Sequence, residues 1–96
     1  MDNAHWLIVY DIYNPRRLQK VEKCMDSYAW RVQKSVFETT ATELVIAQLK
    51  SKLTELIEEE DFILFFKVCE RDWQKQEQYG VTITDEKMKD DSFLVL

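Results

Sequence analysis

The segment that decides the fold is residues 5–12, which read His5-Trp6-Leu7-Ile8-Val9-Tyr10-Asp11-Ile12. A nearly continuous run of apolar, β-branched and aromatic residues is typical of a central strand that is buried on both faces. Because side chains alternate across a strand, Leu7, Val9 and Asp11 share one face and the even-numbered residues share the other. The strand therefore needs other elements packed against both of its sides.

A helix is predicted directly after this strand. Asn14 is a good N-cap, and Pro15 suits the first helical position. The apolar stripe of this helix comprises Leu18, Val21, Met25 and Tyr28, with Cys24 beside it. Residues 29–39 are strand-like, and they predict either one long bent strand or two short strands that meet near Lys34-Ser35.

A second helix is predicted to follow from a capping-box pattern. Thr40-Ala41-Thr42-Glu43 has the S/T-x-x-E form. The buried stripe of the helix comprises Val45, Ile46, Leu49, Leu53, Leu56 and Ile57. The acidic run Glu58-Glu59-Glu60-Asp61 disfavours a longer helix, because negative charge opposes the helix dipole there, and it predicts a solvated link.

The remaining chain completes an alternating order of elements. Residues 62–69 form a second two-faced apolar strand; after it we expect a polar connection around Trp73 and a short strand at 81–84. The order β-α-β-β-α-β predicts an α+β, ferredoxin-like sandwich over residues 1–84. Residues 85–96 are expected to form a charged loop and an apolar C-terminal strand that docks on a sheet edge, of this chain or of a partner.

The composition excludes several classes of protein. Ninety-six residues suffice for one small domain, and the single glycine and single proline exclude glycine-rich phosphate loops. His5 is the only histidine, which argues against Ser-His-Asp and Cys-His catalysis. Cys24 and Cys69 form no C-x-x-C pair and are expected to be buried thiols. The N-terminus lacks a signal-peptide pattern and no apolar run approaches a membrane span of about 20 residues, so we expect a cytoplasmic protein without membrane contact.

The charge of the chain is unevenly distributed. The formal net charge is −5, yet residues 1–35 hold six basic and four acidic residues, a local excess of two positive charges. The overall sign argues against indiscriminate nucleic-acid binding. The first third is nevertheless a basic island within an acidic protein.

The two apolar strands predict a homodimer. Two helices cover only one face of such a sheet, while residues 5–12 and 62–69 also send apolar side chains toward the other face. Leaving these in water forfeits about 1.5–3 kcal/mol for each large side chain. A second copy related by a two-fold axis is the simplest cover for this face.

Asp11 is the candidate catalytic and metal-binding residue, and two interpretations of it are open. A strand-end aspartate often caps the following turn or helix. If the open faces of two copies meet, however, Asp11 approaches its own copy, and paired carboxylates share a proton or bind a cation such as magnesium. A bound ion polarises a phosphodiester and activates water. No neighbouring acid completes a second metal site, so any hydrolysis is expected to be slow.

Five basic residues are candidates for nucleic-acid binding, and each of them also suits a solvated surface. They flank Asp11 in the sequence or lie on the adjacent strand: Arg16, Arg17, Lys20, Arg31 and Lys34. The N-terminus of the first helix adds a preference for phosphate. Such contacts position a polyanion without reading its bases. Tyr10 either supports this site or belongs to the core.

Three strings resemble the CRISPR-associated protein two family, the small dimeric subunit of CRISPR adaptation: Val9-Tyr10-Asp11-Ile12, Arg16-Arg17-x-x-Lys20-Val21, and residues 31–38, RVQKSVFE. The resemblance implies a ferredoxin-like homodimer with Asp11 of each chain at a magnesium site. It also implies metal-dependent endonuclease activity on RNA or DNA, and a bridge between CRISPR integrase copies that holds duplex DNA during spacer acquisition. The positions that match the family motifs are Tyr10, Asp11, Arg17, Arg31 and Phe37.

Two positions depart from the family pattern. Ala29 replaces a glycine that usually precedes R-V-Q, and Leu18 stands where a second basic residue is common. Two alternatives to a nuclease in CRISPR adaptation remain at this point. One is a purely architectural bridge without catalysis, and the other is a toxin-like ribonuclease of the same fold.

Overall fold

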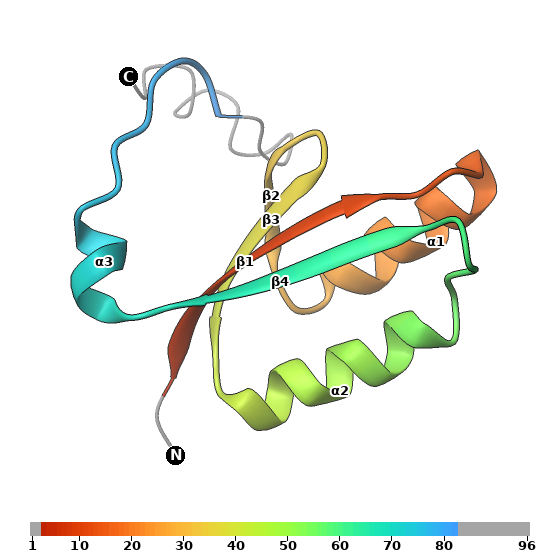
Figure 1. The fold of residues 1–96 in the computed structure, drawn as a ribbon. Coiled ribbons are helices and arrows are strands. Elements are labelled where there is room, and N and C mark those ends of the chain that lie inside the picture. The colour runs from red at the N-terminus through yellow and green to blue at the C-terminus, as the bar shows by residue number, and fades with distance from the viewer. Residues whose placement is uncertain (1–2, 83–96) are drawn as a thin grey trace.

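The sheet is built around β1 (Ala4–Asp11), the strand whose sequence decides the fold. The computed structural model describes residues 3–82 (Figure 1). The other elements are α1 (Pro15–Asp26), β2 (Trp30–Gln33), β3 (Val36–Ala41), α2 (Glu43–Thr54), β4 (Phe62–Val68) and α3 (Glu70–Gln74).

The strands form one antiparallel sheet in the order β2-β3-β1-β4. The helices α1 and α2 lie side by side against one face (Figure 1). This is the predicted ferredoxin-like α+β arrangement. Residues 29–39 resolve into two strands rather than one, with a turn at Lys34-Ser35 and an irregularity between Arg31 and Gln33.

The core lies between the sheet and the two helices. Ile8 and Tyr10 of β1 and Phe37 of β3 are almost completely buried there. They pack against Val21 and Met25 of α1 and Leu49 and Leu53 of α2, which belong to the predicted stripes of these helices. Phe37 and Tyr10 therefore belong to the core, and their rings are 5.7 Å apart.

The predicted N-cap is confirmed for α1 but not for α2. Asn14 caps α1 as predicted, accepting hydrogen bonds from the backbone N–H of Arg16 and Arg17. The expected capping box at Thr40 is wrong, because Thr40 and Ala41 remain paired with β1 as part of β3. The cap of α2 is Thr42, whose Oγ1 accepts from the N–H of Val45 at 3.2 Å.

Three other expectations need correction. The polar connection around Trp73 contains a short helix, α3, and Val81 and Thr82 are not in a strand. Cys69 is exposed rather than buried, whereas Cys24 is partly buried, and both are free thiols. The predicted strand residues 83–84 and the C-terminal segment 85–96 lie outside the described residues.

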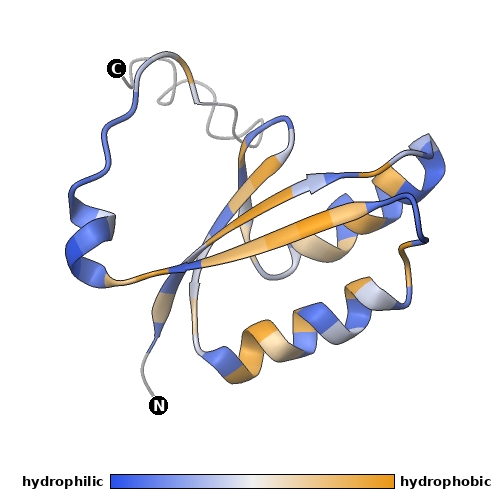
Figure 2. Ribbon diagram, in the orientation of Figure 1, coloured by the Kyte–Doolittle hydropathy of each residue, from blue (hydrophilic) through white to orange (hydrophobic). Residues whose placement is uncertain are grey.

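Within the described residues, neither α1 nor α2 covers the second face of the sheet, and only the short α3 contacts β1 there, at one end. Figure 2 shows the apolar character of β1 and β4 along the middle of the molecule, and the polar character of α3 and the chain after it. The side chains of Phe62, Leu64 and Phe66 are 52%, 38% and 49% exposed. We call this surface of β4, together with Leu7 and Val9 of β1, the open face. Within residues 3–82, no helix is long and apolar enough to span a bilayer.

Candidate functional site

Asp11 is the last residue of β1 and is exposed beside the open face. Its register partner is Phe62, the first residue of β4. Among residues 3–82 its side chain has no hydrogen-bond or ion-pair partner. Its carboxylate is therefore available to a ligand.

The capping interpretation of Asp11 is wrong. The N–H groups of Arg16 and Arg17 donate to Oδ1 of Asn14 at 2.8 Å and 3.1 Å. The N–H of Tyr13 donates to Oδ1 of Asp61 at 2.9 Å. Both turn and helix are thus held by other side chains, and the local structure gives Asp11 no role of this kind.

Arg17 is tied to the loop between α2 and β4. Its Nε donates to Oδ2 of Asp61 at 2.8 Å, and its Nη2 donates to Oε2 of Glu60 at 3.1 Å. Glu58 adds a third carboxylate, 3.6 Å away. The bond from Arg17 holds the pKa of Asp61 well below its usual range. A phosphate that binds Arg17 has to compete with these acids.

Arg31 is also paired, at the opposite side of α1. Its Nη1 donates to Oε2 of Glu22 at 3.0 Å. The Tyr10 hydroxyl donates to the same oxygen at 2.6 Å and lies 2.8 Å from the Lys34 carbonyl oxygen. Burial, reinforced by Glu22, raises the pKa of Tyr10 above its usual range, so the phenol stays protonated. This cluster joins β1, α1 and β2 inside the protomer.

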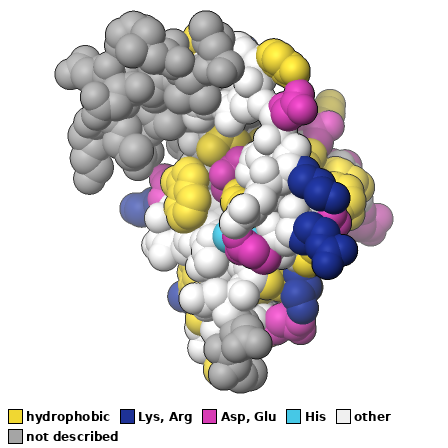
Figure 3. Space-filling model, turned by 90° about the vertical axis from the view of Figure 1, so that its left-hand side faces the viewer, with side chains coloured by type: hydrophobic (Ala, Val, Ile, Leu, Met, Phe, Trp, Pro, Cys, Tyr) yellow, Lys and Arg dark blue, Asp and Glu magenta, His cyan; other side chains and the backbone are white. Residues whose placement is uncertain are grey.

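The other predicted cations are free. Arg16, Lys20 and Lys34 are exposed, and none forms an ion pair within the part of the chain that the structure describes. Arg16 and Lys20 lie on the first turns of α1, close in sequence to Asp11. By contrast, Figure 3 views the α3 end and shows basic side chains next to acidic ones there. The unpaired positive charge of the predicted site thus belongs to α1 and to the turn between β2 and β3.

Beyond the open face, the β2–β3 part of the same side of the sheet is partly covered by the chain itself. Gln33 donates from Nε2 to the carbonyl oxygen of Val81 at 2.9 Å. Residues 76–79 line a groove of about 210 Å³ over Leu7 and Glu38. Burial raises the pKa of Glu38. The β1–β4 half, next to Asp11, keeps its apolar side chains exposed.

A single protomer offers few possible metal ligands. No group of three His, Cys, Asp or Glu residues suited to a metal occurs within residues 3–82. Magnesium requires few protein ligands, however, since water and phosphate complete its six positions. One free carboxylate from each of two copies therefore fits this ion, and one protomer alone does not provide a closed metal site.

Sequence reasoning missed the role of Asp61. The acidic run of residues 58–61 predicts a solvated link, yet the side chain of Asp61 is inaccessible to solvent. The sequence does show that Asp61 ends an acidic run directly before a strand, and that an arginine able to pair with it lies early in the first helix. Pairing over 44 residues is not visible in any local pattern.

Residues 4–76 match the family described as CRISPR associated protein Cas2. The chain belongs to the Cas2 family. It is 34% identical over 84 residues to the CRISPR-associated endoribonuclease Cas2 1 of Moorella thermoacetica, which covers 81% of this chain and 88% of the relative. It is 36% identical over 80 residues to the CRISPR-associated endoribonuclease Cas2 of Methanosarcina acetivorans, with coverages of 82% and 91%.

A solved Cas2 structure supports the same membership. The crystal structure of Streptococcus pyogenes Cas2 superimposes with a TM-score of 0.67 at 35% identity, covering 79% of this chain and 99% of that one. The resemblance carried by the strings around Asp11, Arg17 and Arg31 is thereby confirmed at the level of the family.

Proposed function

We propose that this Cas2 chain acts in CRISPR adaptation as a homodimer that binds duplex nucleic acid and bridges integrase subunits, with magnesium-dependent phosphodiester cleavage at Asp11. The observation that carries the proposal is a free, exposed carboxylate at the edge of an uncovered apolar face. The relatives named endoribonucleases support the nuclease part. The bridging part rests on the family resemblance.

The proposed dimer follows from the free-energy cost of leaving the apolar side chains of the open face in water. Phe62, Leu64 and Phe66 occupy alternate positions of β4, and their side chains are 38–52% exposed. Covering them with the same surface of a second copy removes this apolar area from water. Since Phe62 is the register partner of Asp11, an axis near this point brings the two carboxylates toward each other.

At such a site the two Asp11 carboxylates would hold magnesium, which when bound polarises a phosphodiester and makes a bound water more acidic. Arg16 and Lys20 would draw the nucleic-acid backbone toward the site and neutralise its phosphates. Arg17 and Arg31 would join only by giving up their present carboxylate partners. No group of three possible metal ligands occurs among the described residues, so nothing there supports a second metal site, and we expect the proposed cleavage to be slow.

The test is cleavage of labelled RNA and duplex DNA by Asp11→Asn, with magnesium and with a chelator. We expect the variant and the chelated protein to lose activity together, because both remove the same carboxylate–metal interaction. Asp72→Asn on α3 is the matched control, since it makes the same change on an exposed aspartate at the other end of β4. Undiminished cleavage by Asp11→Asn contradicts the catalytic assignment.

A non-enzymatic bridge is the second candidate function. It is favoured by the single carboxylate that each described protomer contributes. Spacer acquisition in cells distinguishes the two. If Asp11→Ala preserves acquisition while removal of residues 92–96 abolishes it, bridging is the function and cleavage is dispensable.

A further inference from the structure

Asp61 gathers more hydrogen bonds than any other side chain near Asp11. Its Oδ1 accepts from the N–H of Tyr13 at 2.9 Å and from Nη2 of Arg17 at 3.1 Å. Its Oδ2 accepts from Nε of Arg17 at 2.8 Å and from the N–H of Glu58 at 2.9 Å. The side chain is fully shielded from solvent. Both carboxylate oxygens are thus used, in charge-assisted bonds of the stronger kind.

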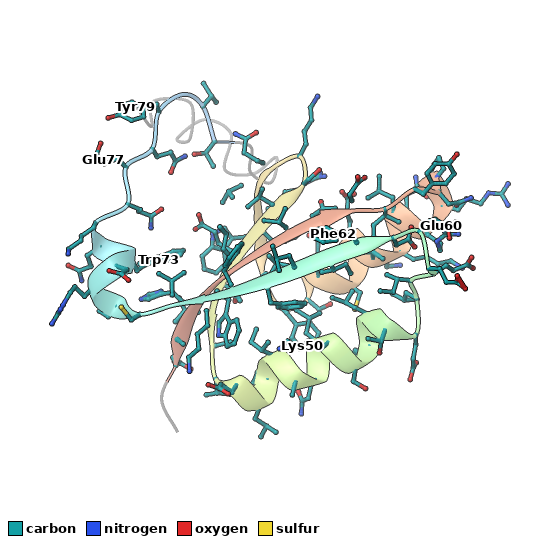
Figure 4. The ribbon with its side chains drawn as sticks, in the orientation of Figure 1. Lys50, Glu60, Phe62, Trp73, Glu77 and Tyr79 are labelled. Carbon is teal, nitrogen blue, oxygen red and sulfur yellow. The ribbon has the colours of Figure 1, made fainter. Side chains whose placement is uncertain are left out.

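These bonds connect three segments at one point. Tyr13 belongs to the loop between β1 and α1, Arg17 to the first turns of α1, and Glu58 to the loop between α2 and β4. Asp61 itself directly precedes Phe62, the residue paired with Asp11. Figure 4 shows Glu60 on this loop, at the opposite end of β4 from Trp73 of α3. The Asp11 backbone is therefore held on one side by β4 and two residues later by the carboxylate of Asp61.

Asp11 has no side-chain partner of its own among residues 3–82. The direction in which its carboxylate leaves the sheet is consequently set by the backbone at the end of β1. A ligand that sits on such a residue depends on the groups that fix that backbone, just as metal ligands depend on the outer groups that orient them.

We infer that Asp61 is a positioning residue, which fixes the β1–α1 loop through the Tyr13 N–H and so aims Asp11. The inference rests on the proposed function for the identity of the ligand, but not for the geometry of the loop. The ion pair with Arg17 orients the Asp61 carboxylate, so that one oxygen faces Tyr13.

Glu60 provides a matched control. Its Oε2 accepts from the same Nη2 of Arg17, at 3.1 Å, but Glu60 holds no backbone N–H of the β1–α1 loop. Glu60→Ala therefore removes an acid from the same guanidinium without releasing Tyr13. Asp61→Asn is a milder variant, since its amide oxygen can still accept from the Tyr13 N–H.

The experiment has two readouts on the full chain, at a temperature where thermal unfolding shows every variant to be folded. The first is the hydrogen-exchange rate of the Tyr13 amide by NMR. The second is Mn²⁺ affinity of the dimer by calorimetry and electron paramagnetic resonance. For Asp61→Ala we expect faster Tyr13 exchange and a loss of about tenfold or more in Mn²⁺ affinity, the usual cost of removing an orienting group.

Glu60→Ala should leave both readouts close to those of the unmodified protein, because an exposed ion pair contributes little. Asp61→Asn should fall between the two. If Asp61→Ala matches Glu60→Ala in Tyr13 exchange and in Mn²⁺ affinity, the inference is overturned.

A failure of the proposed function would give a different set of results. If the unmodified protein binds no Mn²⁺, or if Asp11→Ala binds it equally well, the proposed metal site is wrong. Tyr13 exchange, together with the resonance of Asp11, then decides the positioning role alone, and unchanged values for Asp61→Ala overturn it. If Asp11→Ala abolishes binding but Asp61→Ala does not, the metal site stands and the positioning role falls.

Discussion

The two faces of the sheet carry similar apolar side chains in different surroundings. On the helix face, Phe37 and Ile8 are completely buried beneath α1 and α2. On the open face, Phe62 and Phe66 are about half exposed, although they belong to an equally apolar strand. The helix face therefore stabilises the single chain, and the open face, with the free Asp11 at its edge, remains available for contact with something outside it.

The largest expected effect is on the helix face. Phe37→Ala should lower the free energy of unfolding by about 3–5 kcal/mol, because it removes a completely buried ring and leaves a cavity. Urea denaturation of dilute protein measures this. Leu44→Ala, at an exposed position on α2, is the control and should change stability by less than about 0.5 kcal/mol. Equal losses for the two variants would mean that the core is not where the structure has it.

The next effect concerns the open face. Phe66→Ser should weaken self-association about tenfold or more, because the ring occurs twice in a two-fold interface and each burial contributes about 1.5–3 kcal/mol. Sedimentation equilibrium over a range of concentrations measures the dissociation constant. Leu44→Ser is matched to it, being 57% exposed but on the outer side of α2. A chain that stays monomeric without any substitution, or a Phe66→Ser dimer of unchanged affinity, removes the basis for the proposed interface.

The smallest effect separates the free cations of α1 from the paired one. Arg16→Ala and Lys20→Ala should each reduce the salt dependence of duplex binding by about one unit of slope. Arg17→Gln should reduce it less, because Arg17 already neutralises Asp61 and Glu60. Fluorescence titrations at several salt concentrations provide the slopes, and Lys75→Ala, directly after α3, is the control. A larger change for Arg17→Gln than for Arg16→Ala would show that the acids release Arg17 on binding.

Local signals in the sequence predicted much of the fold. The two-faced composition of residues 5–12 and 62–69 placed β1 and β4, because such runs are stable only when both sides are covered. Asn14-Pro15 fixed the start of α1 through the geometry of a helix end. The position of Asp11 at the end of a strand, beside an apolar face, also followed from the period of two.

What the sequence did not predict depends on pairing between distant segments. Thr40 fits a capping box locally, but pairing with His5 keeps it in β3. Asp61 belongs to an acidic run, and only the folded chain shows Arg17 beside it. Likewise, nothing in the sequence distinguishes Arg17 and Arg31 from the free cations. Their carboxylate partners lie in other segments of the chain: Asp61, in the loop before β4, pairs with Arg17, and Glu22 of α1 pairs with Arg31.

One contact joins β1 to α3, the short helix that follows β4. The His5 ring stacks on Trp73 of α3, with centroids 4.6 Å apart and planes within 2°. Its Nδ1 lies 3.1 Å from Oγ1 of Thr40, and its Nε2 lies 2.5 Å from Oε1 of Glu70. The stack and the bond to Glu70 fasten α3 to β1, so that replacing the imidazole of His5 would release the short helix that follows β4.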